Sequence, residues 1–214
     1  MQESTRKVPK PTPERLATYL AALNDLIERE VHTIASRDIE KLTGINAAQF
    51  RKDLSYFGEF GRPGIGYDVQ GLRDTIARIL KVKEEQPVVL VGAGNLGTAL
   101  LRYPGLMLQN FRIVAVFDNN YNKIGRRIAD LEIQDIANLA EANKTHRARI
   151  GIITVPAPAA QDVANRLIDS GISAILNFAP TSLKVPSGVV VRNVDFVKEL
   201  AVLAFHLSEE SALS

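Results

Sequence analysis

A glycine-rich stretch in the middle of the chain has the residue types and spacing of a phosphate-binding turn. It lies between the apolar run Val88–Val91 and a stretch that favours a helix, and it consists of Gly92, Ala93, Gly94, Asn95, Leu96 and Gly97. The glycines permit a tight turn, close approach of a pyrophosphate to the backbone, and close packing of the helix on the strand. We therefore expect these residues to bind the phosphates of a dinucleotide at a helix N-terminus.

An acidic residue at the end of the next apolar run fits the ribose of such a ligand. Asp118 follows Ile113–Phe117 and lies 21 residues after Gly97. A carboxylate there can bond both ribose hydroxyls of the adenosine and repels a 2′-phosphate, which favours NAD(H) over NADP(H). Arg126 and Arg127 could soften this preference, although we expect both to be solvated. The alternative is that Asp118 is only a turn residue at a strand end.

Two later loops should border the nicotinamide end of the same site. One contains Thr154, Val155 and Pro156, and the other contains Asn177 and Phe178. In an open α/β sheet the ligand lies over the carboxyl ends of the strands, where these loops begin, although each could also be a proline-stopped turn. Neither loop offers a histidine or another proton-transfer pair. We therefore predict no catalytic residue and a cofactor that is sensed rather than used.

Composition restricts the chemistry further. The 214 residues include no cysteine, which excludes disulfides, cysteine-ligated metals and thiol redox chemistry. His32, His146 and His206 are widely separated, so no metal site is expected. No apolar stretch approaches the roughly 18 residues of a membrane span, and the N-terminus lacks the apolar run of a secretory signal. We expect a cytoplasmic protein with no membrane partner.

The elements that position these residues divide near Lys83. Up to that point the pattern is helical, and the charged linker Lys83–Pro87 ends it. Beyond it, apolar runs alternate with helical stretches, which predicts an α/β fold with a parallel sheet. The expected strands are Val88–Val91, Ile113–Phe117, Ile150–Val155, Ala174–Asn177 and Val189–Val191. The expected domains are residues 1–83, 84–193 and 194–214.

The helical part reads as three helices before a glycine-rich segment. The first has Thr12 as its N-cap, followed by Pro13. Its buried stripe is formed by Leu16, Tyr19, Leu20, Leu23 and Ile27. The second begins after Ser36 and stops at a turn around Gly44. The third begins at Asn46, with Gln49 three residues later in a capping-box-like pair.

The third helix, expected over Ala47–Phe57, has the features of a DNA-recognition helix. Its inward face holds Phe50, Leu54 and Phe57, and its outward face holds Ala47, Ala48, Arg51, Lys52 and Ser55. Small residues let a helix lie deep in the major groove, where Arg51 and Lys52 could reach guanine O6 and N7. A net charge of +2 allows only a small basic patch, and a solvated basic face is the alternative.

Segments on either side of the sheet domain extend this interpretation. Gly58–Tyr67 contains four glycines and reads as a hairpin wing with Arg62 at its tip, which suits a narrow minor groove; an ordinary turn is the alternative. Asp195–Leu207 is apolar around most of its circumference. We expect this helix to pack into the partner subunit of a homodimer, with docking on its own domain as the alternative.

Together these segments resemble the Rex family of redox-sensing transcriptional repressors along the whole chain. The resemblance is carried by Arg51–Gly58, Gly64–Val69, Val91–Gly97, Asn177–Pro180 and Val194–Phe196. It implies an N-terminal winged helix-turn-helix domain, a Rossmann-like domain and a C-terminal helix exchanged within a homodimer. It also implies binding to a palindromic operator in double-stranded DNA and release by NADH, so that the protein reports the ratio of NADH to NAD⁺.

The resemblance assigns further roles to individual residues. The expected DNA contacts are Ala47, Ala48, Gln49, Arg51, Lys52, Ser55, Arg62 and Gly64. The implied redox switch places Tyr103 near the nicotinamide, where it exchanges hydrogen bonds with Asp195, next to Phe196, while Arg15 can pair with Asp195. Pro63 stands where the family usually has a basic residue, so minor-groove contact is expected to rest on Arg62.

Two other functions stay open at this point. One is an NAD-dependent oxidoreductase, for which Tyr103 is the plausible proton-transfer residue. The other is a module that binds CoA or another nucleotide, and Asp118 at the ribose position argues against it.

Overall fold

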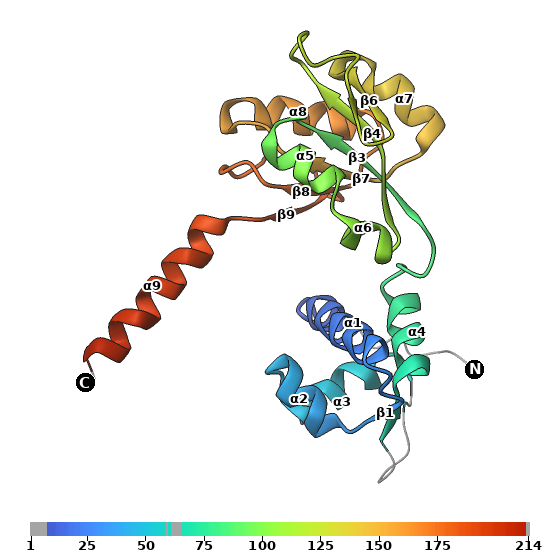
Figure 1. Cartoon of the computed structure of the whole chain (residues 1–214), viewed down its shortest axis with the longest axis vertical. Helices are drawn as coiled ribbons and strands as arrows, with labels where there is room; N and C mark the ends of the chain where they lie inside the picture. The colour runs from blue at the N-terminus through green and yellow to red at the C-terminus, as the bar shows by residue number, and fades with distance from the viewer. Residues whose placement is uncertain (1–7, 59, 61–65, 213–214) are drawn as a thin grey trace. The chain divides into compact units, whose positions relative to one another are not determined.

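The computed structural model describes residues 8–58, 60 and 66–212 of the chain (Figure 1). The chain divides into two compact units, Met1–Glu84 and Glu85–Ser214. The first is mainly helical, and the second is an α/β unit built on a largely parallel sheet. Among the described residues, none of the helices is both long and apolar enough to cross a membrane.

The first unit packs its helices around one apolar core. The helices are α1 (Thr12–Glu28), α2 (Ser36–Thr43), α3 (Ala47–Ser55) and α4 (Val69–Ile79), and strands β1 (Thr33–Ile34) and β2 (Tyr67–Asp68) form an antiparallel pair. Phe50 of α3 is fully buried, and its ring makes edge contacts with the rings of Tyr19 and Tyr67 at centroid distances of 4.9 and 5.3 Å. These contacts hold α3 against α1 and β2.

Several details of this unit differ from the sequence predictions. The N-cap of α1 is Pro11, and the Thr12 hydroxyl donates to Asp53 instead of capping the helix. The buried stripe of α1 closes with Leu26, whereas Ile27 is only partly buried. Strand β2 pairs with β1, which precedes α2 and was not predicted, while most of the expected hairpin Gly58–Tyr67 lies outside the described residues. Helix α3 ends at Ser55, two residues earlier than predicted.

The second unit is doubly wound. The described strands form a seven-stranded sheet in the order β5-β6-β4-β3-β7-β8-β9. They are β3 (Gln86–Val91), β4 (Phe111–Asp118), β5 (Arg127–Ile128), β6 (Leu131–Asp135), β7 (Ile150–Ile153), β8 (Ala174–Asn177) and β9 (Val190–Asn193). Neighbours are parallel except β5 and β6. The chain winds from β3 to one side and then crosses to β7 on the other, so the topological switch point lies between β3 and β7.

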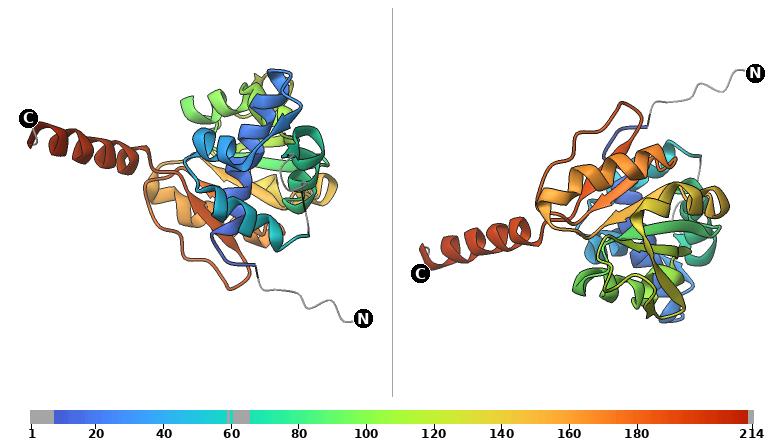
Figure 2. Two further views of the ribbon diagram at one scale, coloured as in Figure 1. Left: turned by 90° about the horizontal axis from the view of Figure 1, so that it is seen from below. Right: turned by 90° about the horizontal axis from the view of Figure 1, so that it is seen from above.

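Helices cover both faces of this sheet (Figure 2). They are α5 (Asn95–Leu101), α6 (Pro104–Leu108), α7 (Leu139–His146) and α8 (Ala157–Asp169), with a short 3₁₀ turn, η1 (Ile136–Asn138), before α7. Val89 and Val91 of β3 join the core beneath α7 and α8, and Val88 and Leu90 join the core beneath α5. A central parallel strand must be apolar on both faces, which explains the continuous valine and leucine run.

The strand predictions hold in kind: β8 has the predicted bounds, and the bounds of the other predicted strands are shifted. Strand β3 begins at Gln86, so Pro87 lies within it rather than in a linker. Pro87 is paired with β4 but lies before the pairing with β7 begins at Val88, and a proline is tolerated where one side of the ladder is open. The short hairpin β5–β6 was not predicted.

The last helix, α9 (Phe196–Ala212), follows β9 at the edge of the sheet. Its apolar side chains are largely exposed, with Phe196, Val197, Leu200, Leu203 and Phe205 each between 59% and 74% accessible. Helices with apolar residues around most of their circumference are normally buried, so this exposed surface is of the kind that packs against another element or a partner.

Candidate functional site

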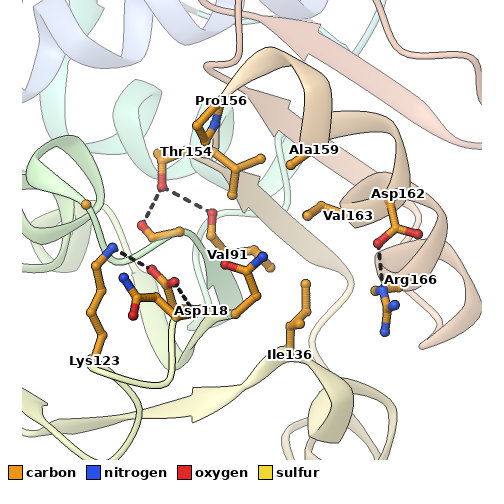
Figure 3. A pocket seen from close by; sticks show the side chains of 15 residues that line it. Val91, Asp118, Lys123, Ile136, Thr154, Pro156, Ala159, Asp162, Val163 and Arg166 are labelled. Atoms are coloured by element: carbon orange, nitrogen blue, oxygen red, sulfur yellow. Dashed lines mark hydrogen bonds and ion pairs between the residues drawn. The ribbon is translucent and has the colours of Figure 1, made fainter.

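A pocket of about 720 Å³ lies at the switch point, where the loops after β3, β4 and β7 converge (Figure 3). It is lined by Val91, Gly92, Gly94, Asp118, Asn119, Asn120, Lys123, Ile136, Thr154, Val155, Pro156, Ala159, Asp162, Val163 and Arg166. Its position is the one at which doubly wound sheets bind ligands. Six of the predicted nucleotide-binding residues meet here: Gly92, Gly94, Asp118, Thr154, Val155 and Pro156.

The glycine turn is tightly packed at Gly92 and Gly97 and open at Gly94. Gly92 has a φ of +109°, and a Cβ there would lie 2.7 Å from the carbonyl oxygen of Thr154. A Cβ on Gly97 would overlap the carbonyl oxygen of Gly92. By contrast, a Cβ on Gly94 would meet no atom within 4 Å. Gly92 and Gly97 are therefore required by packing, whereas Gly94 leaves free the space that a phosphate group needs to approach the backbone.

Asp118 ends β4 as a buried, well-partnered carboxylate. It accepts hydrogen bonds from the backbone N–H groups of Ala93 and Asn120, both at 2.9 Å, and from Nζ of Lys123 at 3.0 Å. Burial alone would raise the pKa of Asp118, but these hydrogen bonds outweigh it and hold the pKa below its usual value. The group stays ionised at neutral pH and can accept hydrogen bonds from a ribose diol.

The far side of the pocket is apolar and ends in an ion pair. Ile136, Ala159 and Val163 supply apolar walls, and Nε of Arg166 lies 2.8 Å from Oδ2 of Asp162 (Figure 3). Such a slot suits a flat heteroaromatic ring with polar edges. These residues, with Lys123 and Asn120, were missed by the sequence reasoning. Part of this wall could have been found from the sequence after the predicted strand Ile150–Val155. Ala159 and Val163 are four residues apart there, and so are Asp162 and Arg166, which is the spacing of one helix face.

Other predicted nucleotide residues lie outside the pocket lining. Ala93 is buried and contributes its N–H to Asp118, while Asn95 and Leu96 open helix α5. Asn177 is fully buried, and its amide donates to the carbonyl oxygens of Ala179 and Thr181 and to Oδ1 of Asn193. It therefore shapes its loop rather than facing the pocket.

The residues of the expected redox switch are accessible. Tyr103 precedes α6 and is 59% exposed, with its ring over Gly105. Phe178 and Phe196 have their ring centroids 6.2 Å apart. Asp195 is exposed and accepts from the N–H groups of Val197 and Lys198, so it caps the N-terminus of helix α9.

The ionisable side chains of the pocket are paired with each other, Lys123 with Asp118 and Arg166 with Asp162. Over the described ranges of the chain, no cluster of three or more histidine, aspartate or glutamate side chains is placed to hold a metal ion. The arrangement fits a dinucleotide: an open backbone at Gly94 for phosphate, a carboxylate for ribose, and an apolar slot for a ring.

In the first unit, α2 and α3 form a helix-turn-helix whose angle is fixed by side chains. Gly44 ends α2 with a φ of +69°. Oε2 of Glu40 accepts from the N–H of Ala47 at 3.0 Å, and Oδ1 of Asn46 accepts from the N–H of Ala48 at 2.7 Å. These two oxygens satisfy free donors in the first turn of α3. A side chain of α2 and a side chain of the turn itself therefore both stabilise the start of α3.

The outward face of α3 differs from the prediction at one residue. Ala48, Arg51, Lys52 and Ser55 are exposed, but Ala47 is 7% exposed and belongs to the core, because the turn brings it under α2. Arg51 is already oriented, since its Nη1 donates to Oγ of Ser36 at 2.9 Å. Arg62, Pro63 and Gly64, the expected wing residues, lie outside the described residues.

One further prediction for this unit is wrong in detail, and one stays untested. Gln49 does not complete a capping box, because its Nε2 donates to Oδ1 of Asp53 at 2.9 Å. Arg15 forms a bidentate ion pair with Asp53, with Nε and Nη2 each 2.6 Å from a carboxylate oxygen, and its expected pairing with Asp195 stays a prediction. Asp53 was not singled out from the sequence at all.

Comparisons with known proteins cover both units. Residues 7–55 match a family described as "Putative DNA-binding protein N-terminus", and residues 83–181 match one described as "CoA binding domain". The redox-sensing transcriptional repressor Rex of Pelotomaculum thermopropionicum is 46% identical over 206 residues, covering 96% of this chain and 97% of that protein.

Solved structures give the same picture. The structure of RSP, a Rex-family repressor, in complex with β-NAD⁺ and operator DNA is similar with a TM-score of 0.88 and 34% identity, over 96% of this chain and 95% of that one. RSP in complex with β-NADH has a TM-score of 0.87 and 33% identity, over 97% of each chain.

Proposed function

Because the chain belongs to the Rex family of redox-sensing transcriptional repressors, we propose that it binds operator DNA as a homodimer and is released when NADH occupies its pocket. The family is one of regulators rather than enzymes. The observation that carries the proposal is the pocket, in which an open glycine turn and an ionised carboxylate stand together without an unpaired proton-transfer group among the described lining residues. Residues 1–83 would read DNA, residues 84–193 would bind the nucleotide, and residues 194–214 would join two subunits.

The DNA contacts are assigned to the exposed face of α3. Arg51 and Lys52 are the cations of that face, and Ala48 and Ser55 are small enough to let the helix lie close to base edges. The hydrogen bond to Ser36 orients Arg51 before DNA is present, which lowers the entropy lost when its guanidinium meets a guanine. Gln49 is committed to Asp53 and is assigned to packing rather than to a base. Arg62 and Gly64 stay assigned to the wing on sequence grounds.

The nucleotide is assigned to residues that fit its parts. Gly92 and Gly94 offer backbone to the pyrophosphate, Asp118 accepts from the adenosine ribose, and Ile136 and Val163 flank the adenine. NAD⁺ and NADH supply rings that differ by one charge and in planarity. Thr154, Val155 and Pro156 line the pocket next to the glycine turn and border the path toward that ring.

The homodimer is assigned to α9. Its exposed apolar side chains, Phe196 to Phe205, need cover, and a second copy of the same helix or of the second unit provides it symmetrically. A two-fold dimer would place two α3 helices on half-sites about 34–36 Å apart, or a multiple of that distance. This matches the palindromic operator that the family resemblance implies.

Release requires that NADH favour a dimer whose α3 helices miss their half-sites. A coupling of about 1–3 kcal/mol gives about 5- to 150-fold weaker operator binding. Tyr103, Asp195 and Phe196 are assigned to the transmission because all three are exposed where α6 and α9 begin. Arg15 is assigned to it through the family resemblance, and in this structure its guanidinium pairs with Asp53.

The test is a gel-shift titration of a palindromic operator at fixed salt, without nucleotide and with NADH, NAD⁺ or CoA. Fixed salt is needed because phosphate contacts make affinity salt-dependent. Release by NADH and not by NAD⁺ supports the proposal. Release by CoA alone would favour the function suggested by the match to a CoA-binding domain. Specific binding that ignores all three ligands would contradict the sensing role.

A further inference from the structure

The recognition helix α3 carries a buried negative charge that the proposed DNA contacts do not use. Asp53 is 0% exposed and lies on the inner side of α3, directly after the exposed Arg51 and Lys52. An isolated carboxylate in an apolar core is strongly unfavourable, so its presence here needs a compensating set of donors. Its neighbours Phe50 and Leu54 are apolar core residues, which makes the position unusual for an acid.

The donors come mostly from one stripe of α1. Asp53 accepts from Oγ1 of Thr12 at 3.2 Å, from Nε and Nη2 of Arg15 at 2.6 Å each, and from the hydroxyl of Tyr19 at 3.0 Å. The fifth bond comes from Gln49, one turn earlier on α3. Residues 12, 15 and 19 follow the spacing of one helix face, so a single face of α1 meets a single point of α3. Both carboxylate oxygens are fully engaged.

Such a contact fixes an angle in a way that apolar packing does not. Apolar core residues can be exchanged for others of similar volume at small cost, and such cores lose a unique geometry before they lose stability. A bidentate guanidinium–carboxylate pair holds two elements in one register, and replacing it by apolar residues often leaves stability unchanged. The group is thus better suited to orientation than to stability. Since α2 is tied to α3 by Glu40 and Ser36, α2 and α3 would move together if the tie to α1 were lost.

We propose that Asp53 is the positioning residue of the recognition helix: its buried carboxylate fastens α3 to α1 at the angle at which Arg51 and Lys52 read the operator. The proposal rests on the proposed DNA-binding function. It assigns Thr12, Arg15 and Tyr19 as the anchor on α1. Asp53 itself does not touch DNA, and its effect passes through the orientation of α3.

The experiment compares the full chain with D53N, Y19F and the control D74N. Asp74 also accepts from an arginine and a glutamine, but on α4 and in a partly exposed position. Y19F keeps the ring that packs on Phe50 and removes one donor to Asp53. Each variant is measured for affinity to the operator and to a scrambled duplex at fixed salt, for NADH affinity, and for its thermal midpoint.

D53N is expected to weaken operator binding by about 10- to 150-fold, the range for hydrogen bonds to a charged group. Binding to the scrambled duplex should change little, because phosphate contacts of the exposed cations persist. Y19F should lose about 3-fold on the operator alone, as one hydrogen bond of modest net strength is removed. D74N should match the wild type, and NADH affinity should be unchanged in all three.

Several results would overturn the proposal. They are operator binding by D53N equal to that of the wild type, or losses of equal size on operator and scrambled DNA. If D53N does not fold, Y19F decides: wild-type operator affinity in Y19F rejects the positioning role. If the wild-type chain does not bind the operator, the proposed function is contradicted instead. The anchoring of α3 by Asp53 is then tested separately, and it requires faster amide exchange in α3 of Y19F than in α3 of D74N.

Discussion

Gly94 and Gly97 stand three residues apart in one turn, and replacing each by alanine should have opposite consequences. At Gly94 the backbone has φ −82° and ψ −166°, which alanine adopts freely, and an added Cβ meets no atom within 4 Å. G94A should therefore fold as well as the wild type or gain about 0.4–1 kcal/mol from the stiffer unfolded chain. The same methyl group occupies the space through which a phosphate reaches the backbone. Losing one charge-assisted hydrogen bond of about 1.5–3 kcal/mol weakens NADH binding about 10- to 150-fold.

At Gly97 the added Cβ overlaps the carbonyl oxygen of Gly92 and approaches Oγ1 of Thr154 to 2.9 Å. Both groups are rigid, so G97A should destabilise the second unit by about 3 kcal/mol or more.

Urea unfolding measures the stability of both variants, and the quenching or enhancement of NADH fluorescence measures binding. G94A should also bind the operator with wild-type affinity and resist release by NADH, because its DNA-reading unit is untouched. If G94A binds NADH as tightly as the wild type does, the assignment of the glycine turn to the pyrophosphate is wrong. If G94A instead loses stability as G97A does, the open space described at Gly94 is not there.

Four further changes test other parts of the account. R51A should weaken operator binding by about 1–3 kcal/mol in gel shifts, and an equal loss on scrambled DNA would make Arg51 a phosphate contact only. L203E on the exposed face of α9 should convert the dimer to a monomer in sedimentation, since two buried leucines contribute about 3–6 kcal/mol; an unchanged dimer would place the interface elsewhere. K123M removes the cation beside Asp118, so the preference for NADH over NADPH should sharpen by about 3- to 5-fold in competition binding. An unchanged ratio of the two affinities would show that Lys123 does not affect this preference. The pKa of Asp53 is lowered in the folded chain, so its ionic stabilisation is present above the unfolded pKa of about 4 and is lost as the pH falls below that value. The difference in unfolding midpoint between wild type and D53N should therefore shrink on acidification. A difference that stays constant with pH would contradict this.

The sequence was informative where function depends on residues close together in the chain. The glycine turn and Asp118 follow consecutive strands, and strand order alone brings them to the same sheet edge. The outward cations of α3 could be read from helical spacing because α3 is short and regular. The same local logic placed Tyr19 and Leu23 in the core.

The misses arise where distant segments meet. The partners of Asp53 on α1 are 34 to 41 residues away, so its burial could not be inferred from the pattern of α3 alone. Ala47 is a small residue of the kind that faces a DNA groove, yet the turn after Gly44 places it in the core. Asn177 stands at a strand end like Asp118, but the loop that follows folds back and uses every polar atom of its amide. Strand β5 has two residues, too few to show a period.

The central claim is that nucleotide and operator compete through one equilibrium, and linkage tests it most directly. Titrating NADH into the wild-type chain, alone and with saturating operator at the same salt, gives two affinities. The account predicts that the operator weakens NADH binding by the same factor, about 5- to 150-fold, by which NADH weakens operator binding. An NADH affinity that is unchanged by saturating operator would contradict it.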